Sequence, residues 1–312
     1  MMHPYSRRQI LTAIASAAAG VAVSGLAAEP GKEELRASYR KWIESLPEAP
    51  KPELTRHGLV ATELNRWHVL EANQGVAVDA EHFYGIGNFA LVKHRKSDGK
   101  RVAQWFGQRG GSIIHFNSGW VDKDRLILSH SNFSQLPMAS SIETYDTKTL
   151  QPLSSHSLGI RLGSLTWAIR HNGYWYACFA NYNDSGTTPG FDQRWTYLGQ
   201  YDDKWQLLQS WLFPPQVVAS WGVSSSSGGD FGDDGLLYAT GHDAPELHVL
   251  RLPNQGVTLE YVTTVDVPFE GQAWAWDRSA KGDRVIYGIS REKQQIISAR
   301  IPAVPAALYA RA

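Results

Sequence analysis

The sequence predicts an all-β fold: a five-bladed β-propeller, closed by an N-terminal strand and preceded by a short amphipathic helix. From residue 73 onward, a unit of four short strand-like runs recurs at a spacing near that of propeller blades. The last unit has only three such runs, so a strand from the start of the chain is needed to complete it. Six blades is the alternative count, which requires strands hidden in the insertion at 183–200.

Each unit begins with a run that we expect to be the innermost strand of a blade. A tight polar turn such as DKDR or GDDG follows each run, which is typical of antiparallel hairpins. The segment 59–72 has strand character, and we expect it to supply the missing outer strand and protect the edge of the last blade. The five innermost runs are 73–79, 115–121, 164–170, 224–231 and 271–277.

The N-terminal residues 1–28 resemble a twin-arginine-type signal peptide, because Arg7 and Arg8 precede an apolar, alanine-rich stretch. An uncleaved membrane anchor is the alternative. We therefore expect a bacterial protein exported to the periplasm or the exterior by the twin-arginine machinery, with no stable membrane span after processing. Residues 29–53 predict an amphipathic helix and a proline-rich linker, and residues 54–312 predict the propeller domain.

The charge balance restricts the partners. The chain has 30 Lys and Arg and 30 Asp and Glu, so its net charge is near zero and it lacks the basic footprint of a nucleic-acid-binding protein. Its single cysteine, Cys178, alternates with aromatic residues in a strand-like run and is expected to be a buried thiol. The expected partner is a small molecule or an oligosaccharide.

Polar residues gather at one end of the predicted strands. In up-and-down blades, the connections between blades and the loops that leave each second strand lie on one face, here called the loop face; the tight turns lie at the opposite, tight-turn end. We expect the polar strand ends on the loop face to converge around the mouth of the central channel, where loops on a rigid scaffold often carry function. Hydrogen bonding between neighbouring blades is the structural alternative. These strand ends hold Gln74, Asn88, His115, His130, Ser131, Asn132, Ser164, Asn181, Tyr182, Ser224–Ser227, His242, Asp243, Gln272, Arg291 and Glu292.

Three histidines at this face, His115, His130 and His242, are the predicted catalytic residues, since imidazole can act as an acid or base near neutral pH. Alternatively, they bind a divalent metal, with Gln272 or Asp243 completing the coordination, although no local ligand spacing supports it. Asp243 is not expected to orient His242, because adjacent strand residues point to opposite sides.

The remaining polar residues are assigned to substrate binding. Arg291 is expected either to hold a carboxylate or phosphate group or to pair with Glu292 or Asp243. Candidate stacking surfaces, with the protein core as the alternative, are Trp167, Trp221, Trp274 and Tyr182. The predicted substrate-binding residues are Gln74, Asn88, Asn132, Asn181, Tyr182, Asp243, Gln272 and Arg291.

This organisation resembles secreted β-propellers, and five blades are similar to the glycosidase propellers of the arabinanase and invertase type. Those families place two or three carboxylates on inner strands around the axis, whereas Asp79, Asp230 and Asp277 fall toward the tight-turn end here. A face lined by His, Gln and Arg is more similar to propeller polysaccharide lyases, in which a basic residue abstracts the proton α to a uronate carboxylate. The resemblance implies a carbohydrate-active enzyme, a lyase or hydrolase acting on oligosaccharides. A noncatalytic periplasmic binding propeller and a metal-dependent lactonase or redox protein are the alternatives.

Overall fold

The computed structural model describes residues 32–48, 52–183 and 188–310, so the predicted signal peptide lies outside the described residues. The chain divides into two units between residues 51 and 52. The first contains the predicted helix, α2 (Lys32–Ser45), on which Tyr39, Trp42 and Ile43 are exposed. No helix within the described ranges has the length and apolar character needed to cross a membrane.

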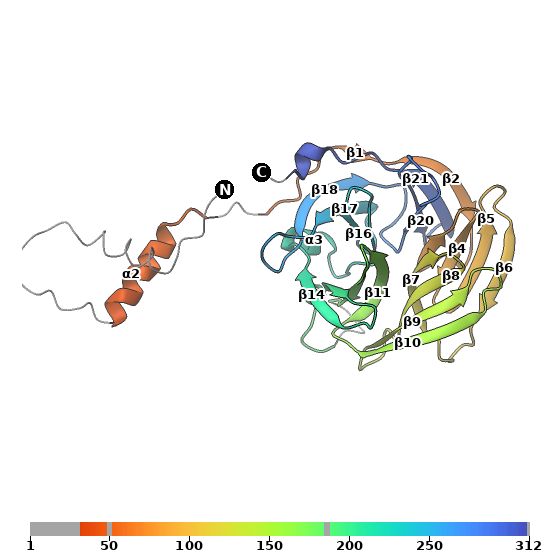
Figure 1. Ribbon diagram of the computed structural model, residues 1–312, viewed down its shortest axis with the longest axis horizontal. Coiled ribbons are helices and arrows are strands. Elements are labelled where there is room, and N and C mark those ends of the chain that lie inside the picture. The colour runs from red at the N-terminus through yellow and green to blue at the C-terminus, as the bar shows by residue number, and fades with distance from the viewer. Residues whose placement is uncertain (1–31, 49–51, 184–187, 311–312) are drawn as a thin grey trace, which may run out of the picture. The chain divides into compact units, whose positions relative to one another are not determined.

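The second unit is a ring of five small sheets, which confirms the predicted five-bladed propeller (Figure 1). The first blade consists of β3 (Gly75–Val78), β4 (His82–Gly87), β5 (Ala90–Arg95) and β6 (Arg101–Phe106). The second consists of β7 (His115–Asp122), β8 (Arg125–Ser131), β9 (Ala139–Asp146) and β10 (Pro152–Ile160). The third consists of β11 (Ser164–His171), β12 (Tyr174–Ala180), β13 (Tyr197–Tyr201) and β14 (Leu207–Leu212).

The last two blades both include strands from the beginning of the propeller domain. The fourth consists of β15 (Gly228–Phe231), β16 (Leu237–Thr240), β17 (Glu246–Arg251) and β18 (Glu260–Asp266), and β1 (Leu59–Val60) is added parallel to β18. The fifth consists of β19 (Ala275–Trp276), β20 (Val285–Ser290), β21 (Gln295–Arg300) and β2 (Thr62–His68). The antiparallel pairing of β2 with β21 confirms that an N-terminal strand closes the ring.

Buried apolar residues form one cluster between each pair of neighbouring blades. Trp167 and Cys178 of the third blade pack with Phe231 and Leu237 of the fourth, for example. The other four clusters repeat this arrangement around the ring. Each middle strand is therefore covered on both faces, which makes its residues buried whichever way they point.

Three inner strands are shorter than the sequence predicts, β3 by three residues and the other two by more. β15 begins at Gly228 rather than at residue 224, and β19 has only two residues. Two residues of the preceding serine run form side-chain hydrogen bonds outside the blade: the Trp167 indole N–H donates to Ser226 Oγ (3.0 Å), and Ser225 Oγ contacts Thr196 Oγ1 (2.6 Å).

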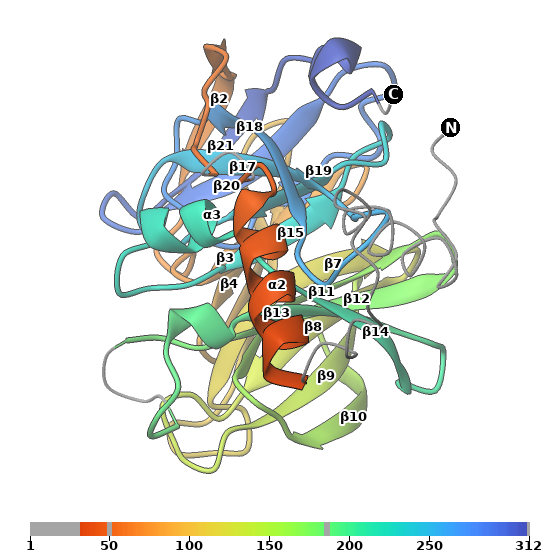
Figure 2. The same cartoon turned by 90° about the vertical axis from the view of Figure 1, so that its left-hand side faces the viewer.

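Three short helices complete the described chain, and the sequence did not predict them. The helix α3 (Pro215–Ser220) lies in the connection from β14 to β15 (Figure 2). The 3₁₀ turns η1 (Gln193–Trp195) and η2 (Ala306–Leu308) precede β13 and follow β21. All three therefore occur in connections or after the last strand, outside the four-strand pattern of the blades.

Candidate functional site

The structure brings four of the predicted loop-face side chains together. Burial, together with the nearby charges of His130, Arg291 and His242, lowers the pKa of His115 to about 4. These residues belong to the second, fourth and fifth blades, so separate parts of the sequence meet at the channel mouth. Their catalytic and binding roles stay predictions.

A chain of contacts runs along the rim of this mouth. Nδ1 of His242 lies 2.6 Å from Oδ1 of Asp243, and Nε2 of His242 lies 3.1 Å from Nη1 of Arg291. Because a guanidinium group can only donate, Nε2 accepts from Arg291, and Nδ1 carries the proton that His242 donates to Asp243. The imidazole is thus held in one orientation from both sides.

The contact between Asp243 and His242 differs from the sequence-based expectation. β16 ends at Thr240, so the two residues lie beyond the strand and its alternation of side-chain directions no longer applies to them. The side chain of Arg291 contacts His242, a partner that the sequence did not indicate. Its backbone N–H donates to Oε2 of Glu270 at 2.7 Å.

His115 lies beside an aromatic wall. Its ring centroid is 5.3 Å from that of Phe133, which in turn is 5.2 Å from that of Tyr182. Because the pKa of His115 is about 4, its imidazole is neutral at pH 7 and can accept a proton or a hydrogen bond. The wall therefore combines apolar ring surface with one polar, uncharged group.

His130 has both ring nitrogens engaged. Nε2 accepts from the backbone N–H of Ile114 (3.0 Å), and Nδ1 lies 2.9 Å from Oγ of Ser141, which donates to Oε1 of Glu143 (2.6 Å). Nδ1 therefore carries the proton, and burial lowers the pKa of His130. A role in metal binding or proton transfer would require one of these bonds to break.

The predicted metal site lacks a ligand set in this structure. Within the described ranges, no three His, Cys, Asp or Glu side chains are grouped so that they could hold one metal ion. His115, His130 and His242 do not form such a group, because hydrogen bonds occupy the nitrogens of His130 and orient His242 between Asp243 and Arg291.

Several predicted substrate-binding amides bond to the protein backbone. Asn132 closes its own loop through Pro137 O (3.0 Å), and Asn181 donates to Trp195 O (3.2 Å). Gln272 of the fifth blade donates to the carbonyl oxygen of His242 in the fourth (2.8 Å). These contacts agree with the structural alternative, and Gln272 also fixes the loop that carries His242.

The two remaining amides of the predicted set take part in backbone contacts between blades. The Gln74 carbonyl accepts from the backbone N–H of Ala273 at 3.3 Å, and the Asn88 carbonyl accepts from that of Phe116 at 2.8 Å. Oδ1 of Asn88 is buried without a hydrogen-bond partner among the described residues. The backbones of both residues thus join neighbouring blades.

A cavity of about 500 Å³ opens at the tight-turn end of the channel, which the sequence did not predict as a site. It is bordered by inner strands and by the turns that follow them. Trp167 and Trp274 border it but are almost fully buried, and Trp221 is buried elsewhere, so these three predicted stacking residues are mainly core. Residues that border the cavity include Asp79, Lys93, Trp120, Trp167, Asp230 and Arg278.

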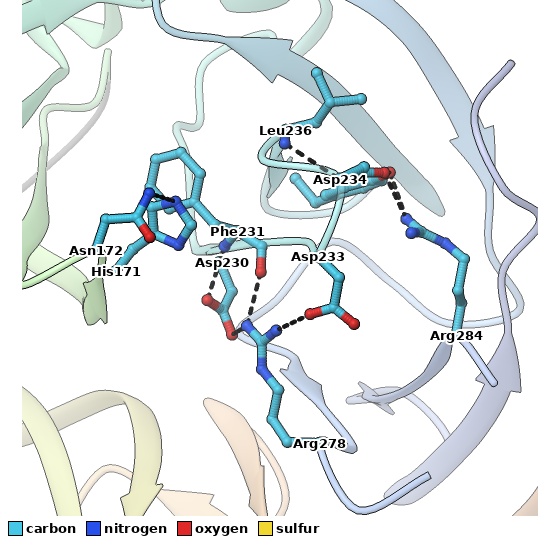
Figure 3. A network of polar contacts seen from close by, with 10 residues as sticks. His171, Asn172, Asp230, Phe231, Asp233, Asp234, Leu236, Arg278 and Arg284 are labelled. Carbon is cyan, nitrogen blue, oxygen red and sulfur yellow. Dashed lines mark hydrogen bonds and ion pairs between the residues drawn. The ribbon is translucent and has the colours of Figure 1, made fainter. Parts of the chain in front are cut away.

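A buried carboxyl group and an arginine link two blades beside this cavity (Figure 3). Oδ2 of Asp230 lies 3.1 Å from Nη2 of Arg278, and Oδ1 accepts from the N–H of Phe231 at 2.7 Å. Burial raises the pKa of Asp230 to about 6, while the charge of Arg278 opposes this rise. Arg278 also contacts Asp233, and Arg284 similarly reaches Asp234 from the fifth blade (3.1 Å).

A comparison with one solved structure supports the fold. No protein-family model and no curated protein matches the chain. The solved glutaminyl cyclase of Myxococcus xanthus is similar with a TM-score of 0.55 and 11% identity, covering 81% of this chain and 100% of that one. The WD40 domain of Toxoplasma gondii coronin has a TM-score of 0.35 and 12% identity, covering 80% and 62% of the two chains. At this identity the likeness is one of fold: the chain is a β-propeller with five blades, and its architecture is similar to that of the glutaminyl cyclase over most of its length.

Proposed function

We propose that this protein is an exported carbohydrate-active enzyme whose active site lies at the loop-face mouth of the channel. The observation that carries the proposal is the chain of contacts from Asp243 through His242 to Arg291. It places a basic imidazole nitrogen beside a cation that can bind a substrate carboxylate. This pair suits elimination from a uronate-containing oligosaccharide, which is lyase chemistry.

Substrate binding would free the base. A carboxylate forms a charge-assisted pair with a guanidinium group, and this pair is stronger than the bond from Arg291 to a neutral imidazole. Arg291 therefore exchanges His242 for the uronate carboxylate, which leaves the Nε2 lone pair next to the carbon that bears this carboxylate. The base is protected until an anionic substrate arrives.

The elimination then proceeds by one proton transfer and one bond cleavage. The proton α to the uronate carboxylate passes to Nε2 of His242, and its electron pair forms the new carbon–carbon double bond. The glycosidic oxygen at the β carbon leaves with the other electron pair and takes a proton from water. Asp243 stabilises the imidazolium ion through its contact with Nδ1.

The aromatic wall supports a saccharide as the substrate. Phe133 and Tyr182 offer ring faces of the kind on which a pyranose stacks, and neutral His115 can accept a hydrogen bond from a hydroxyl group. The neutral form of His115 also avoids a second cation beside Arg291, which keeps the anion-binding role on one residue.

A panel of uronate-containing polysaccharides tests this proposal, with the ultraviolet absorbance of the unsaturated product as the readout. The parent protein is expected to cleave at least one of them, and His242→Ala is expected to abolish the reaction. His68→Ala, which alters an exposed histidine on β2, is the matched control and should react like the parent. A folded parent protein with no absorbance change on any polyuronate would overturn lyase chemistry.

The neutral state of His115 favours a second candidate, cyclisation of a glutaminyl residue, the activity that the structural neighbour's name describes. A neutral imidazole can take the proton that an amine loses as it attacks an amide carbon. Release of ammonia from a peptide with N-terminal glutamine measures this reaction. Loss of ammonia release in His115→Ala, but not in His68→Ala, would support it, and no release by the parent would eliminate it.

A further inference from the structure

Lys93 on β5 is a buried lysine whose charge is unbalanced. Only 9% of its surface is exposed, and its Nζ donates one hydrogen bond, to the carbonyl of Thr147 at 2.9 Å. Nζ also lies 5.5 Å from the centroid of the Tyr84 ring. Among the described residues, no carboxylate oxygen comes within 4.0 Å of it. An ammonium group has three donors, so two remain for another acceptor, and a buried charge is costly without a partner.

The same ammonium-bearing side chain borders the cavity at the tight-turn end. The volume of about 500 Å³ lies in the range typical of small-molecule sites. The indole rings of Trp120 and Trp167 also border it, from the second and third blades. The site thus combines aromatic surface with one buried cation that has no ion-pair partner in the part of the chain that the structure describes.

Of the carboxyl groups that border the cavity, Glu81 is exposed, and the two less exposed ones, Asp79 and Asp230, are already engaged. Asp79 accepts from the backbone N–H groups of Glu81 and His82 and from the hydroxyl of Tyr84. Asp230 accepts from the N–H of Phe231 and from Arg278. Lys93 is thus the buried charged group of the cavity that has no ion-pair partner among the described residues. The partner that its ammonium group lacks is an anion.

We propose that this cavity is a second ligand site, separate from the loop face, and that it binds a small organic carboxylate through Lys93. The carboxylate accepts the two remaining hydrogens of the ammonium group, and a ring of the ligand packs against the indoles. An organic acid suits the aromatic walls better than inorganic phosphate, which would leave them without contact. A sugar acid and an aromatic acid share this chemistry.

Thermal unfolding of the full chain in the presence of defined probes tests the proposal. The probes are glucuronate, glucose, benzoate and inorganic phosphate, because glucuronate and glucose differ at the carboxylate-bearing carbon. Glucuronate or benzoate at millimolar concentration is expected to raise Tm by a few degrees, whereas glucose is not. The larger of the two shifts distinguishes a sugar acid from an aromatic acid. A shift with phosphate alone, or with none of the probes, overturns the assignment.

Variants locate the response. Lys93→Met should abolish the rise in Tm. Lys93→Gln should also abolish it, and the glutamine amide can still donate a hydrogen bond to the carbonyl of Thr147. The glutamine variant therefore tests the proposal even if the methionine variant does not fold. Lys123→Met, at the exposed rim of the cavity, should respond like the parent. Arg291→Ala should also respond, because the loop-face site is independent of this one. A shift lost in Arg291→Ala but kept in Lys93→Gln would place the carboxylate at the loop face and overturn the second site.

Discussion

Nη1 of Arg291 lies 3.1 Å from Nε2 of His242, and this contact joins the fifth blade to the fourth at the loop face. It connects two residues that are far apart in sequence. The carbonyl of His242 is held in addition by the side chain of Gln272 at 2.8 Å, so the imidazole is positioned through its backbone as well as through its ring. A base held in this way loses little conformational entropy when a substrate binds.

Asp243→Asn is expected to lower turnover by about 10²–10⁴-fold with little change in KM, because an amide stabilises the imidazolium ion less well than a carboxylate. Steady-state kinetics at one pH, with kcat and KM determined separately, measure the effect. Glu292→Gln, an exposed acid on the same rim, is the control. Equal kinetics for the two variants would show that Asp243 has no positioning role.

Asp230→Asn is expected to stabilise the protein at neutral pH. The pKa of this carboxyl is raised from 3.8 to about 6, so the folded state binds its proton more tightly than the unfolded state. Its contribution to stability is therefore greatest below pH 3.8 and is lost as the pH rises through 6. Asparagine resembles the protonated acid. The free energy of unfolding of the variant should therefore exceed that of the parent by on the order of 1–3 kcal/mol at pH 8, and by almost nothing at pH 3.5.

Chemical denaturation at these two pH values measures the gain. Asp233→Asn is the matched control, because Asp233 contacts the same arginine while its side chain is 96% exposed. Its stability should change little at either pH. If Asp230→Asn were less stable than the parent at pH 8, the ion pair with Arg278 would outweigh the cost of burying the carboxylate.

Buried histidines act in the opposite direction. The pKa of His115 and that of His248 are both lowered from 6.5 to about 4 by burial, so both side chains bind protons more weakly in the folded state. The stability that they contribute is complete above pH 6.5 and is lost as the pH falls toward 4. We expect Tm to fall across this window, and to fall less in His115→Asn than in the control His68→Asn. Thermal unfolding at several pH values, with both histidine variants made in the Asp230→Asn background, measures this without the opposite pH dependence of the Asp230 carboxyl. An equal fall of Tm with pH in the two histidine variants would contradict the prediction.

The blades were predictable from sequence because each repeats the same local chemistry: a short apolar strand followed by a polar hairpin turn such as DKDR or GDDG. The closing strand β2 was predictable because the last unit lacked its outer strand. The parallel pairing of the two-residue strand β1 with β18 was not, since so short a pairing leaves no periodic pattern. The serine run before β15 was also misassigned, because Ser225 and Ser226 form hydrogen bonds with side chains of the third blade.

The tight-turn cavity depends on tertiary contacts that a sequence pattern does not contain. A Cβ atom on Gly229 would lie 2.5 Å from Cζ2 of Trp167, so this ring occupies the space that the glycine of the next blade leaves free. The sequence did not indicate that Lys93 is buried, because its alternation with apolar residues is also typical of a strand with one solvated face. In the structure, β5 is covered on both sides by neighbouring blades, which buries the lysine.

Truncation at the N-terminus should separate the roles of the helix and the closing strand. A chain that begins at Pro52 lacks the helix but keeps β1, β2 and the contacts of Arg56 with Glu246 and Asp266, so its Tm should equal that of the parent. A chain that begins at Val69 lacks both strands and exposes the unpaired backbone of β21. Because an open, apolar sheet edge promotes association, this chain is expected to aggregate or to unfold at a lower temperature. Light scattering during thermal unfolding compares the two, and equal behaviour would show that β21 is a stable edge without β2.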